Sequence, residues 1–378
     1  MNFLQRERAT LTTALPSLDA RLAALSLAEM EKPGNPAIPI FRECGGSGLV
    51  IPAEYGGAGL APVDAVRAQF AIGSRAPSLA IATTMHHFSV ATIVEMVAMK
   101  IGSGFEWMLL EAIAKQKLLV ASGFAEGRSG ANIMSSFVRV ERRGGDFIIS
   151  GSKKPCSLAH SMDLLTASMI VERPSGDTEL AVAILPSATP GIERRPFWTN
   201  EILSGAESDE VVLDNVVVQD KLVSYLGPPN RLDALQSRGF LWFELLIAAS
   251  YLGIAAGLVE RVLTSGKGSA AERTQLGIEI VGALAALEGV AQSMNSKQTA
   301  DENRHELARA LFVRYSVQRA IESATALATE ILGGMAFIRS SEPSYLRSAA
   351  HCLVFHPPGR LSALTALSTY LDGDPLVI

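Results

Sequence analysis

The chain has 378 residues, of which 48% are hydrophobic and 19% charged, and its formal net charge is −5. This length and apolar content support two or three folded domains and exclude a disordered chain, which needs low hydrophobicity and high net charge. The negative charge and the 6% aromatic content argue against a nucleic-acid partner, because they provide neither a basic field nor a stacking surface.

The N-terminal region is expected to be helical. Residues 1–8 mix acidic and basic side chains without an apolar core, which does not resemble a signal peptide. Apolar residues recur at helical spacing from Leu11 to Glu31, and a helical pattern resumes from Val63 to Lys115. A stretch rich in proline and glycine separates them and includes the loop of residues 48–60. We therefore expect a helical domain over residues 1–117.

The periodicity changes to that of β-strands in the middle third of the chain. Residues 138–151 form two alternating runs around Gly144-Gly145, the pattern of a β-hairpin. Residues 180–185 and 210–218 are further strand candidates, and Asp214-Asn215 is typical of a turn. We expect a β-barrel-like domain over residues 118–222.

Residues 223–378 return to a helical pattern, with four segments long enough to form a bundle. These segments are 240–265, 277–297, 302–332 and 359–371. The apolar run 241–259 approaches the length of a membrane span, but Glu244 interrupts it and small residues recur at the spacing of packed helices. We therefore favour a buried helix over a membrane span. The predicted fold class is α+β: a helical domain, a β domain and a four-helix bundle.

Four local motifs and this order of domains resemble the acyl-CoA dehydrogenase superfamily of flavoproteins, over essentially the whole chain. Residues 50–60 resemble its Val-Pro-Glu-Glu-Tyr-Gly-Gly-x-Gly stretch, and residues 330–337 resemble its Gln-x-Leu-Gly-Gly-x-Gly-Phe stretch. Residues 150–154 and 208–218 resemble two of its strand motifs. The resemblance implies FAD between the β domain and the bundle, and a homodimer or homotetramer in which each FAD touches a neighbouring subunit.

The resemblance also implies which residues bind the flavin. Residues 121–132 correspond to a loop that offers backbone N–H groups and hydroxyls to the polar edge of the flavin ring. Ala125, Ala131 and Asn132 replace the Thr, Ser and Asp of that loop, so backbone contacts are expected to persist and hydroxyl contacts are not. The alternative is an ordinary glycine-rich loop. The implied cofactor-binding residues are Phe124, Glu126, Gly130, Ala131, Ser157, Arg273, Glu330, Gly333 and Gly334.

Three of these positions have specific implied roles. Ser157 corresponds to a hydroxyl that hydrogen-bonds the flavin, and Pro155 replaces an aromatic residue beside it. Arg273 corresponds to an arginine that reaches the FAD pyrophosphate of the partner subunit, a contact that suits its planar fork. Gly333-Gly334 would let the chain pass close to the adenosine. A solvated charge and a helix C-cap are the alternatives for Arg273 and the glycine pair.

The usual catalytic base of the superfamily is missing. α,β-Dehydrogenation needs a carboxylate to take the α-proton while a hydride passes to the flavin. In most members this base is the Glu of Tyr-Glu-Gly-Thr, whereas the corresponding residues here are His356 or Pro357, and no acidic residue lies between Glu342 and Asp372. Glu244 and His356 are the two candidate replacements. A structural salt bridge and a capping or packing histidine are the respective alternatives.

The substrate pocket is expected to include a histidine pair and two aromatic residues. By resemblance, His86 and His87 lie on a helix that faces the substrate, and Trp242 and Phe243 adjoin Glu244. Adjacent helical residues point about 100° apart, so the histidine pair is not a metal site. The three cysteines are far apart and form no Cys-x-x-Cys pair, which indicates a reduced, cytoplasmic compartment and no metal site.

Three functions remain open at this point. The first is a FAD-dependent desaturase of an acyl thioester, carried by CoA or an acyl-carrier protein, with an electron-transfer flavoprotein as acceptor. The second is a monooxygenase that hydroxylates carbon or nitrogen with O₂ and reduced flavin from a flavin reductase. The third is a catalytically silent partner subunit. The missing Glu favours the second, while Arg273 and Glu244 favour the first, which is the preferred prediction.

Overall fold

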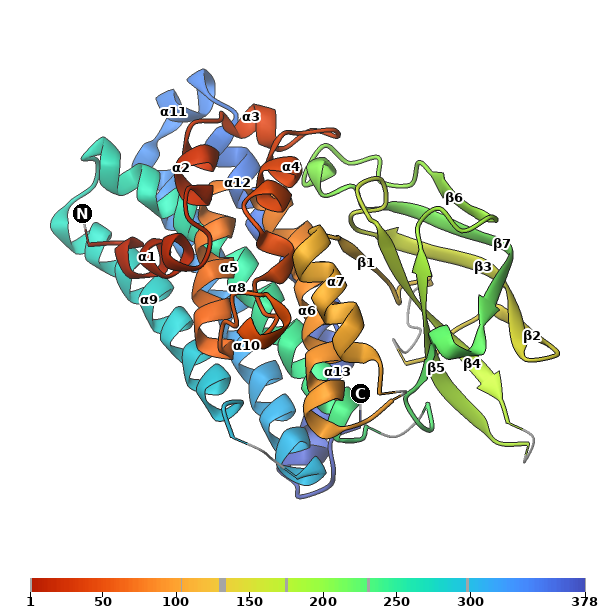
Figure 1. Cartoon of the computed structure of the whole chain (residues 1–378). Helices are drawn as coiled ribbons and strands as arrows, with labels where there is room; N and C mark the ends of the chain where they lie inside the picture. Colours follow the sequence, from red (N-terminus) through yellow and green to blue (C-terminus); the bar gives the residue numbers. More distant parts are fainter. Residues whose placement is uncertain are drawn as a thin grey trace.

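A computed structural model describes residues 2–102, 104–128, 134–173, 176–229, 232–296 and 299–377. Helices come first, strands follow and a second set of helices ends the chain, as predicted. The two helical regions pack against each other, and the strands lie at one side of them (Figure 1).

The N-terminal region is helical up to residue 116. Its helices are α1 (Gln5–Ala14), α2 (Leu18–Ala23), α3 (Leu27–Met30), α4 (Ala37–Glu43), α5 (Pro62–Arg75), α6 (Pro77–Met99) and α7 (Glu106–Gln116). The expected helix from Leu11 to Glu31 is broken into three pieces. Ser17, which follows Pro16, has a φ of 73°, and Ser26 starts α3 with a capping box to Glu29.

The described strands form two four-stranded sheets. The strands are β1 (Val120–Gly123), β2 (Arg139–Arg143), β3 (Asp146–Cys156), β4 (Leu164–Glu172), β5 (Thr178–Pro186), β6 (Ile192–Arg195), β7 (Asp209–Gln219) and β8 (Val223–Tyr225). The orders are β1-β4-β5-β8 and β2-β3-β7-β6, with β1 parallel to β4. The hairpin expected at Gly144-Gly145 joins β2 to β3. β8 pairs with β5 and lies just beyond residue 222.

Asp214-Asn215 is not a turn between strands. Both residues lie within β7, where they form a bulge opposite β3. Asn215 has a φ of 51°, and its backbone N–H donates to the Ser150 hydroxyl at 3.1 Å. Asparagine tolerates the left-handed conformation, which both turns and bulges use. Here the strand continues on both sides of Asn215, so the conformation belongs to a bulge.

The C-terminal region is a helical bundle followed by shorter helices. Its helices are α8 (Ala234–Ser265), α9 (Ala270–Ser293), α10 (Ala300–Leu332), α11 (Gly334–Arg339), α12 (Glu342–His351) and α13 (Arg360–Leu371). Asp233, Ser269 and Thr299 begin the three long helices with capping boxes.

α8 is the central helix of the protein. It is long and apolar enough to cross a membrane, but its most apolar window is entirely buried, whereas the corresponding window of α9 is one-third buried. α5 and α8 cross closely because glycines lie where their backbones approach: a Cβ on Gly253 would lie 2.2 Å from the carbonyl oxygen of Phe70. The small residues of the run 241–259 therefore serve helix packing, as expected from the sequence.

Candidate functional site

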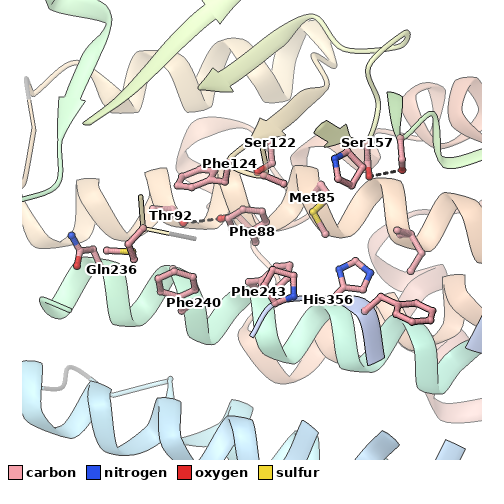
Figure 2. Close-up of a pocket in the computed structure, with 18 of the residues that line it drawn as sticks. Met85, Phe88, Thr92, Ser122, Phe124, Ser157, Gln236, Phe240, Phe243 and His356 are labelled. Atoms are coloured by element: carbon pink, nitrogen blue, oxygen red, sulfur yellow. Dashed lines mark hydrogen bonds between the residues drawn. The ribbon is translucent and has the colours of Figure 1, made fainter. Parts of the chain in front are cut away.

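A cavity of about 280 Å³ lies where α6, α8 and the β region meet. Side chains of α6 and α8 face each other across it, and residues of β1 and the end of β3 close one side (Figure 2). Residues 352 and 355–357, which follow α12, close another part of the wall. The wall therefore combines segments from all three regions of the chain.

One face of α6 forms a wall of the cavity. Ile81, Met85, Phe88 and Thr92 line it, at the spacing that places residues on one side of a helix. The ring of Phe88 lies edge-on to Phe243 of α8, with 5.4 Å between the ring centroids. The cavity-facing residues of both helices are mostly hydrophobic, so this wall is apolar and aromatic.

His86 and His87 do not line the cavity, which corrects the expectation for this pair. The Nδ1 atom of His86 accepts a hydrogen bond from the Val120 backbone N–H at 3.0 Å, and Nε2 donates to the Ser47 carbonyl at 2.9 Å. Burial lowers the pKa of His86 to about 4, which keeps the ring neutral. His87 is 1% exposed and packs against Phe41. Both histidines lie beside Met85 and Phe88 in sequence but are rotated to the side of α6 away from the cavity.

Of the two aromatic residues expected in the pocket, Phe243 faces the cavity and Trp242 does not. Phe243 lines the cavity, whereas the Trp242 Nε1–H donates to Glu95 at 3.0 Å. Arg238 donates to the same carboxylate oxygen, at 2.8 Å. Trp242 therefore joins α8 to α6 in a buried polar contact, and Phe243 alone faces the site.

The β region contributes a polar edge to the cavity. Ser122, Ser157 and Ser208 line it, and the Ser157 and Ser208 hydroxyls lie 2.9 Å apart. Phe124, which the resemblance implies as a flavin-binding residue, also lines the cavity, and its contact with the flavin stays a prediction. A wall with hydroxyls on one side and aromatic side chains on the other suits a flavin ring, which has a polar edge and an apolar face. The residues present thus fit this cofactor.

The Glu126 carboxylate is held by three hydrogen bonds within the β region. Its carboxylate accepts from the Lys153 ammonium at 2.6 Å, from the Ser136 hydroxyl at 2.7 Å and from the Phe137 N–H at 2.8 Å. Burial raises the pKa of Glu126, but the Lys153 charge and these donors more than offset it and lower the pKa overall. Glu126 therefore ties its loop to β3 and does not line the cavity. Gly130 and Ala131 lie outside the described residues.

The other implied FAD residues gather at one end of the bundle. Arg273 is in the first turn of α9, and its Nη1 donates to the Gly266 carbonyl at 3.3 Å. Gly333 ends α10 with a φ of 76°, and the Lys267 ammonium donates to the neighbouring Leu332 carbonyl at 2.5 Å. Neither Arg273, Glu330, Gly333 nor Gly334 lines the cavity of its own chain. Their contact with a neighbouring subunit's flavin stays a prediction.

Glu244 does not face the cavity, and the geometry gives it a structural role. Its Oε2 accepts from the Arg314 Nη1 at 2.7 Å, and the two side chains are 1% and 0% exposed. Phe240, Phe243 and Tyr251 are the cavity-facing positions of α8 around it. Glu244 is one residue after Phe243 and is thus turned by about 100° away from the site. The salt bridge considered as its alternative is present.

His356 lines the cavity, in contrast to Glu244. Its Nε2 lies 2.7 Å from the hydroxyl of Tyr251, a residue that the sequence analysis did not single out. Burial lowers the pKa of His356 to about 3, with a further contribution from Arg314, so the ring is neutral at ordinary pH. The available sequence signal for Tyr251 was its spacing from Phe243 along one face of α8.

Cys156, at the end of β3, packs in the interior. The Cys156 thiol is buried, its pKa is raised to about 12 by burial, and its Sγ donates to the Ser122 carbonyl at 3.6 Å. It is therefore an unreactive packing residue. Over the described part of the chain, no group of three or more His, Cys, Asp or Glu side chains could hold a metal ion.

A cavity with a hydroxyl edge and an aromatic wall, set between a sheet region and a helical bundle, suits the flavin that the resemblance implies. No family model matches the chain. It is 42% identical to the isobutylamine N-hydroxylase of Streptomyces viridifaciens, over the full length of both chains. Two more distant relatives are each 22% identical over 73% of this chain: a probable acyl-CoA dehydrogenase of Bacillus subtilis (strain 168) and a cyclohex-1-ene-1-carbonyl-CoA dehydrogenase of Syntrophus aciditrophicus (strain SB).

Solved structures show the same fold. A nitrososynthase from Micromonospora carbonacea var. africana aligns over 99% of this chain and 98% of its own, with a TM-score of 0.83 and 19% identity. The FMN-bound TdsC from Paenibacillus sp. A11-2 aligns over the same shares, with a TM-score of 0.78 and 18% identity. The chain belongs to the acyl-CoA dehydrogenase superfamily of flavoproteins, and it is a flavin-dependent oxidoreductase.

Proposed function

We propose that the protein is a flavin-dependent monooxygenase that hydroxylates the nitrogen of a small aliphatic primary amine. The observation that carries this proposal is the 42% identity, over the full length of both chains, with an isobutylamine N-hydroxylase. The proposal corresponds to the second of the three functions weighed from the sequence. It replaces desaturation of an acyl thioester as the preferred function.

The chemistry of the cavity supports this choice. Among the residues that the structure describes, no aspartate or glutamate lines the cavity, so the carboxylate that α,β-desaturation needs is missing. A cavity without a carboxylate offers no counter-charge to an ammonium ion, so burial there favours the neutral amine. An amine must use its nitrogen lone pair to accept oxygen, so an apolar cavity that favours the neutral form promotes N-hydroxylation.

The overall reaction is RNH₂ + O₂ + 2e⁻ + 2H⁺ → RNHOH + H₂O. Reduced flavin, delivered by a separate reductase, supplies the two electrons and activates O₂. Phe88, Phe240 and Phe243 bind the alkyl group and exclude water. Ser157 and Ser208 would donate hydrogen bonds to the polar edge of the flavin ring, and His356 would supply a polar contact on another part of the wall.

The function is tested by incubating the protein with a flavin reductase, NADH, O₂ and a panel of C3 to C6 primary amines. We expect hydroxylamine products, detected by mass spectrometry, with ¹⁸O incorporated from ¹⁸O₂. The matched control replaces the amines with alcohols of the same carbon skeleton. No hydroxylamine from any amine, together with anaerobic bleaching of bound oxidised flavin by an acyl thioester, would return the assignment to desaturation.

We propose FAD as the flavin, in keeping with the resemblance. Arg273 is half-buried, and among the residues that the structure describes its side chain donates to the Gly266 carbonyl at 3.3 Å, which leaves further guanidinium donors for a pyrophosphate. FMN lacks this pyrophosphate. An FMN-bound structure exists for the TdsC neighbour, so the two cofactors require direct comparison.

Arg273→Ala is expected to weaken FAD binding by about 10- to 100-fold, the effect of losing a charge-assisted hydrogen bond. FMN binding is expected to stay the same, because FMN has a single phosphate and no pyrophosphate for Arg273 to bind. Equilibrium titration of both flavins, oxidised and reduced, measures the difference. Arg139→Ala, in exposed β2, is the control. Equal weakening of FAD and FMN would contradict the assignment.

We also propose that a second copy of the chain covers the outer face of α9. Ile278 and Val281 of this helix are 60% and 57% exposed, and a groove runs between α9 and α10. Arg273 begins the same helix, so a neighbour seated there would also bring its flavin near the bundle end. Sedimentation of the wild type against Ile278→Glu tests the proposal, and a monomeric wild type would overturn it.

A further inference from the structure

We propose that Tyr251 is a positioning residue that fixes the tautomer of His356, so that Nδ1 carries the proton and meets the cavity as a hydrogen-bond donor. The use of this donor rests on the proposed function. The tautomer itself does not, because it follows from contacts within the chain.

The first step is the direction of the hydrogen bond between the two residues. The Tyr251 hydroxyl lies 2.7 Å from the His356 Nε2, and Tyr251 is 1% exposed. Burial raises the pKa of Tyr251 well above its usual value, so the hydroxyl keeps its proton. Within the described residues, His356 is the hydrogen-bond partner of this hydroxyl. The phenol O–H therefore donates, and Nε2 accepts.

The second step is the charge of His356. Burial, aided by the Arg314 charge, lowers the pKa of the ring to about 3. A neutral imidazole has one N–H and one bare nitrogen. Since Nε2 is the bare nitrogen that accepts from Tyr251, the proton belongs on Nδ1.

The third step is the fixed position of the ring. Arg314 donates to the carbonyl of His356 at 2.5 Å and to that of Pro357 at 3.2 Å. The His356 ring also lies 5.3 Å from the Tyr251 ring and 6.3 Å from that of Phe243, between centroids. With Nε2 engaged by Tyr251, Nδ1 is the nitrogen left to meet a molecule in the cavity.

The consequence is a choice between two chemical roles for His356. A fixed Nδ1–H can stabilise negative charge that develops on an oxygen atom during oxygen transfer. It cannot accept a proton from an ammonium group or from an α-carbon, because its only bare nitrogen is occupied. The structure therefore makes His356 a donor and not the general base that a replacement for the superfamily's Glu would be.

The tautomer is tested directly by two-bond ¹H–¹⁵N correlation spectra of ¹⁵N-histidine-labelled protein. The chain has six histidines, so the His356 signals can be assigned by their loss in His356→Asn. We expect ¹⁵N shifts of a neutral ring with the proton on Nδ1. A proton on Nε2, or a charged ring at pH 7, would overturn the proposal. This readout needs neither flavin nor substrate, so it stands even if no amine is hydroxylated.

Tyr251→Phe tests the functional consequence, and Tyr315→Phe is its matched control. The Tyr315 hydroxyl donates to the carbonyl of Pro358 at 2.9 Å, in the same loop but away from the His356 ring. We expect Tyr251→Phe to bind flavin like the wild type, to populate the Nε2–H tautomer, and to lower the hydroxylamine formed per flavin oxidised by about tenfold. Hydrogen peroxide rises in compensation. Tyr315→Phe is expected to match the wild type in tautomer and yield.

Two outcomes of this comparison overturn the proposal. One is a Tyr251→Phe protein whose His356 keeps the Nδ1–H tautomer with an unchanged yield. The other is an equal loss of yield in both variants with no change of tautomer in either, which indicates a general effect on the loop. A failure of the wild type to hydroxylate any amine counts against the proposed function and not against the tautomer.

Discussion

Replacing Arg314 by methionine is expected to lower the free energy of unfolding by about 3–5 kcal/mol, because it leaves the Glu244 carboxylate buried without its partner. The pair is 2.7 Å apart and both side chains are almost fully buried. Arg314 also donates to the His356 and Pro357 carbonyls, so the loop that carries His356 loses its anchor as well. Denaturant unfolding monitored by circular dichroism measures the change.

A matched control and a double variant test whether the loss of stability comes from the unpaired buried charge. Arg195→Met breaks an ion pair with Glu193 in which both side chains are more than half exposed, and it is expected to cost less than about 1 kcal/mol. Glu244→Leu combined with Arg314→Met removes both buried charges and is expected to recover much of the stability. Because the double variant also lacks the Arg314 contacts with the His356 loop, it tests the stability argument alone. Equal unfolding midpoints for Arg314→Met and Arg195→Met would contradict the buried-pair argument.

Replacing His356 by alanine is expected to lower the rate of hydroxylamine formation by about 10²-fold, the effect of removing one donor from a water-excluded site. Flavin affinity is expected to change little, since His356 is one of many cavity contacts. Oxidation of the reduced flavin continues, but its oxygen appears as hydrogen peroxide. Rapid mixing of reduced, protein-bound flavin with O₂ and amine, followed by product quantification, measures both branches.

Replacing His356 by asparagine or by glutamine tests which of its two ring nitrogens supports the reaction. Asparagine places its amide nitrogen near the position of Nδ1, and glutamine places it near Nε2. We expect His356→Asn to retain at least about tenfold more activity than His356→Gln, because the first keeps a donor on the cavity side. Equal activities of the two variants would assign the loss to packing alone.

The sequence predicted local features wherever the pattern is set by neighbours along the chain. The β2–β3 hairpin follows from alternation around Gly144-Gly145, and the buried α8 follows from small residues in an apolar run. Errors arose where one local signal allows two structures. Asp214-Asn215 suits a turn and a bulge equally, and the leucine spacing of residues 11–31 persists across helix breaks at Ser17 and Ser26.

The tertiary structure decided which side chains reach the site. His86, His87, Trp242 and Glu244 each lie next to a cavity-lining residue in sequence, yet each is turned away from the cavity. A rotation of about 100° per helical residue means that a register error of one position exchanges a site residue for a packing residue.

The sequence by itself determined the superfamily, the use of a flavin and the absence of the usual glutamate, since these depend on motifs and residue identities. It did not decide between desaturation and hydroxylation. Only the tertiary structure decided that Glu244 is neutralised by Arg314, 70 positions away, and that Tyr251 meets His356, 105 positions away. Such contacts join segments that no local pattern relates. They arise because a buried charge or polar group is costly unless the folded chain supplies its partner.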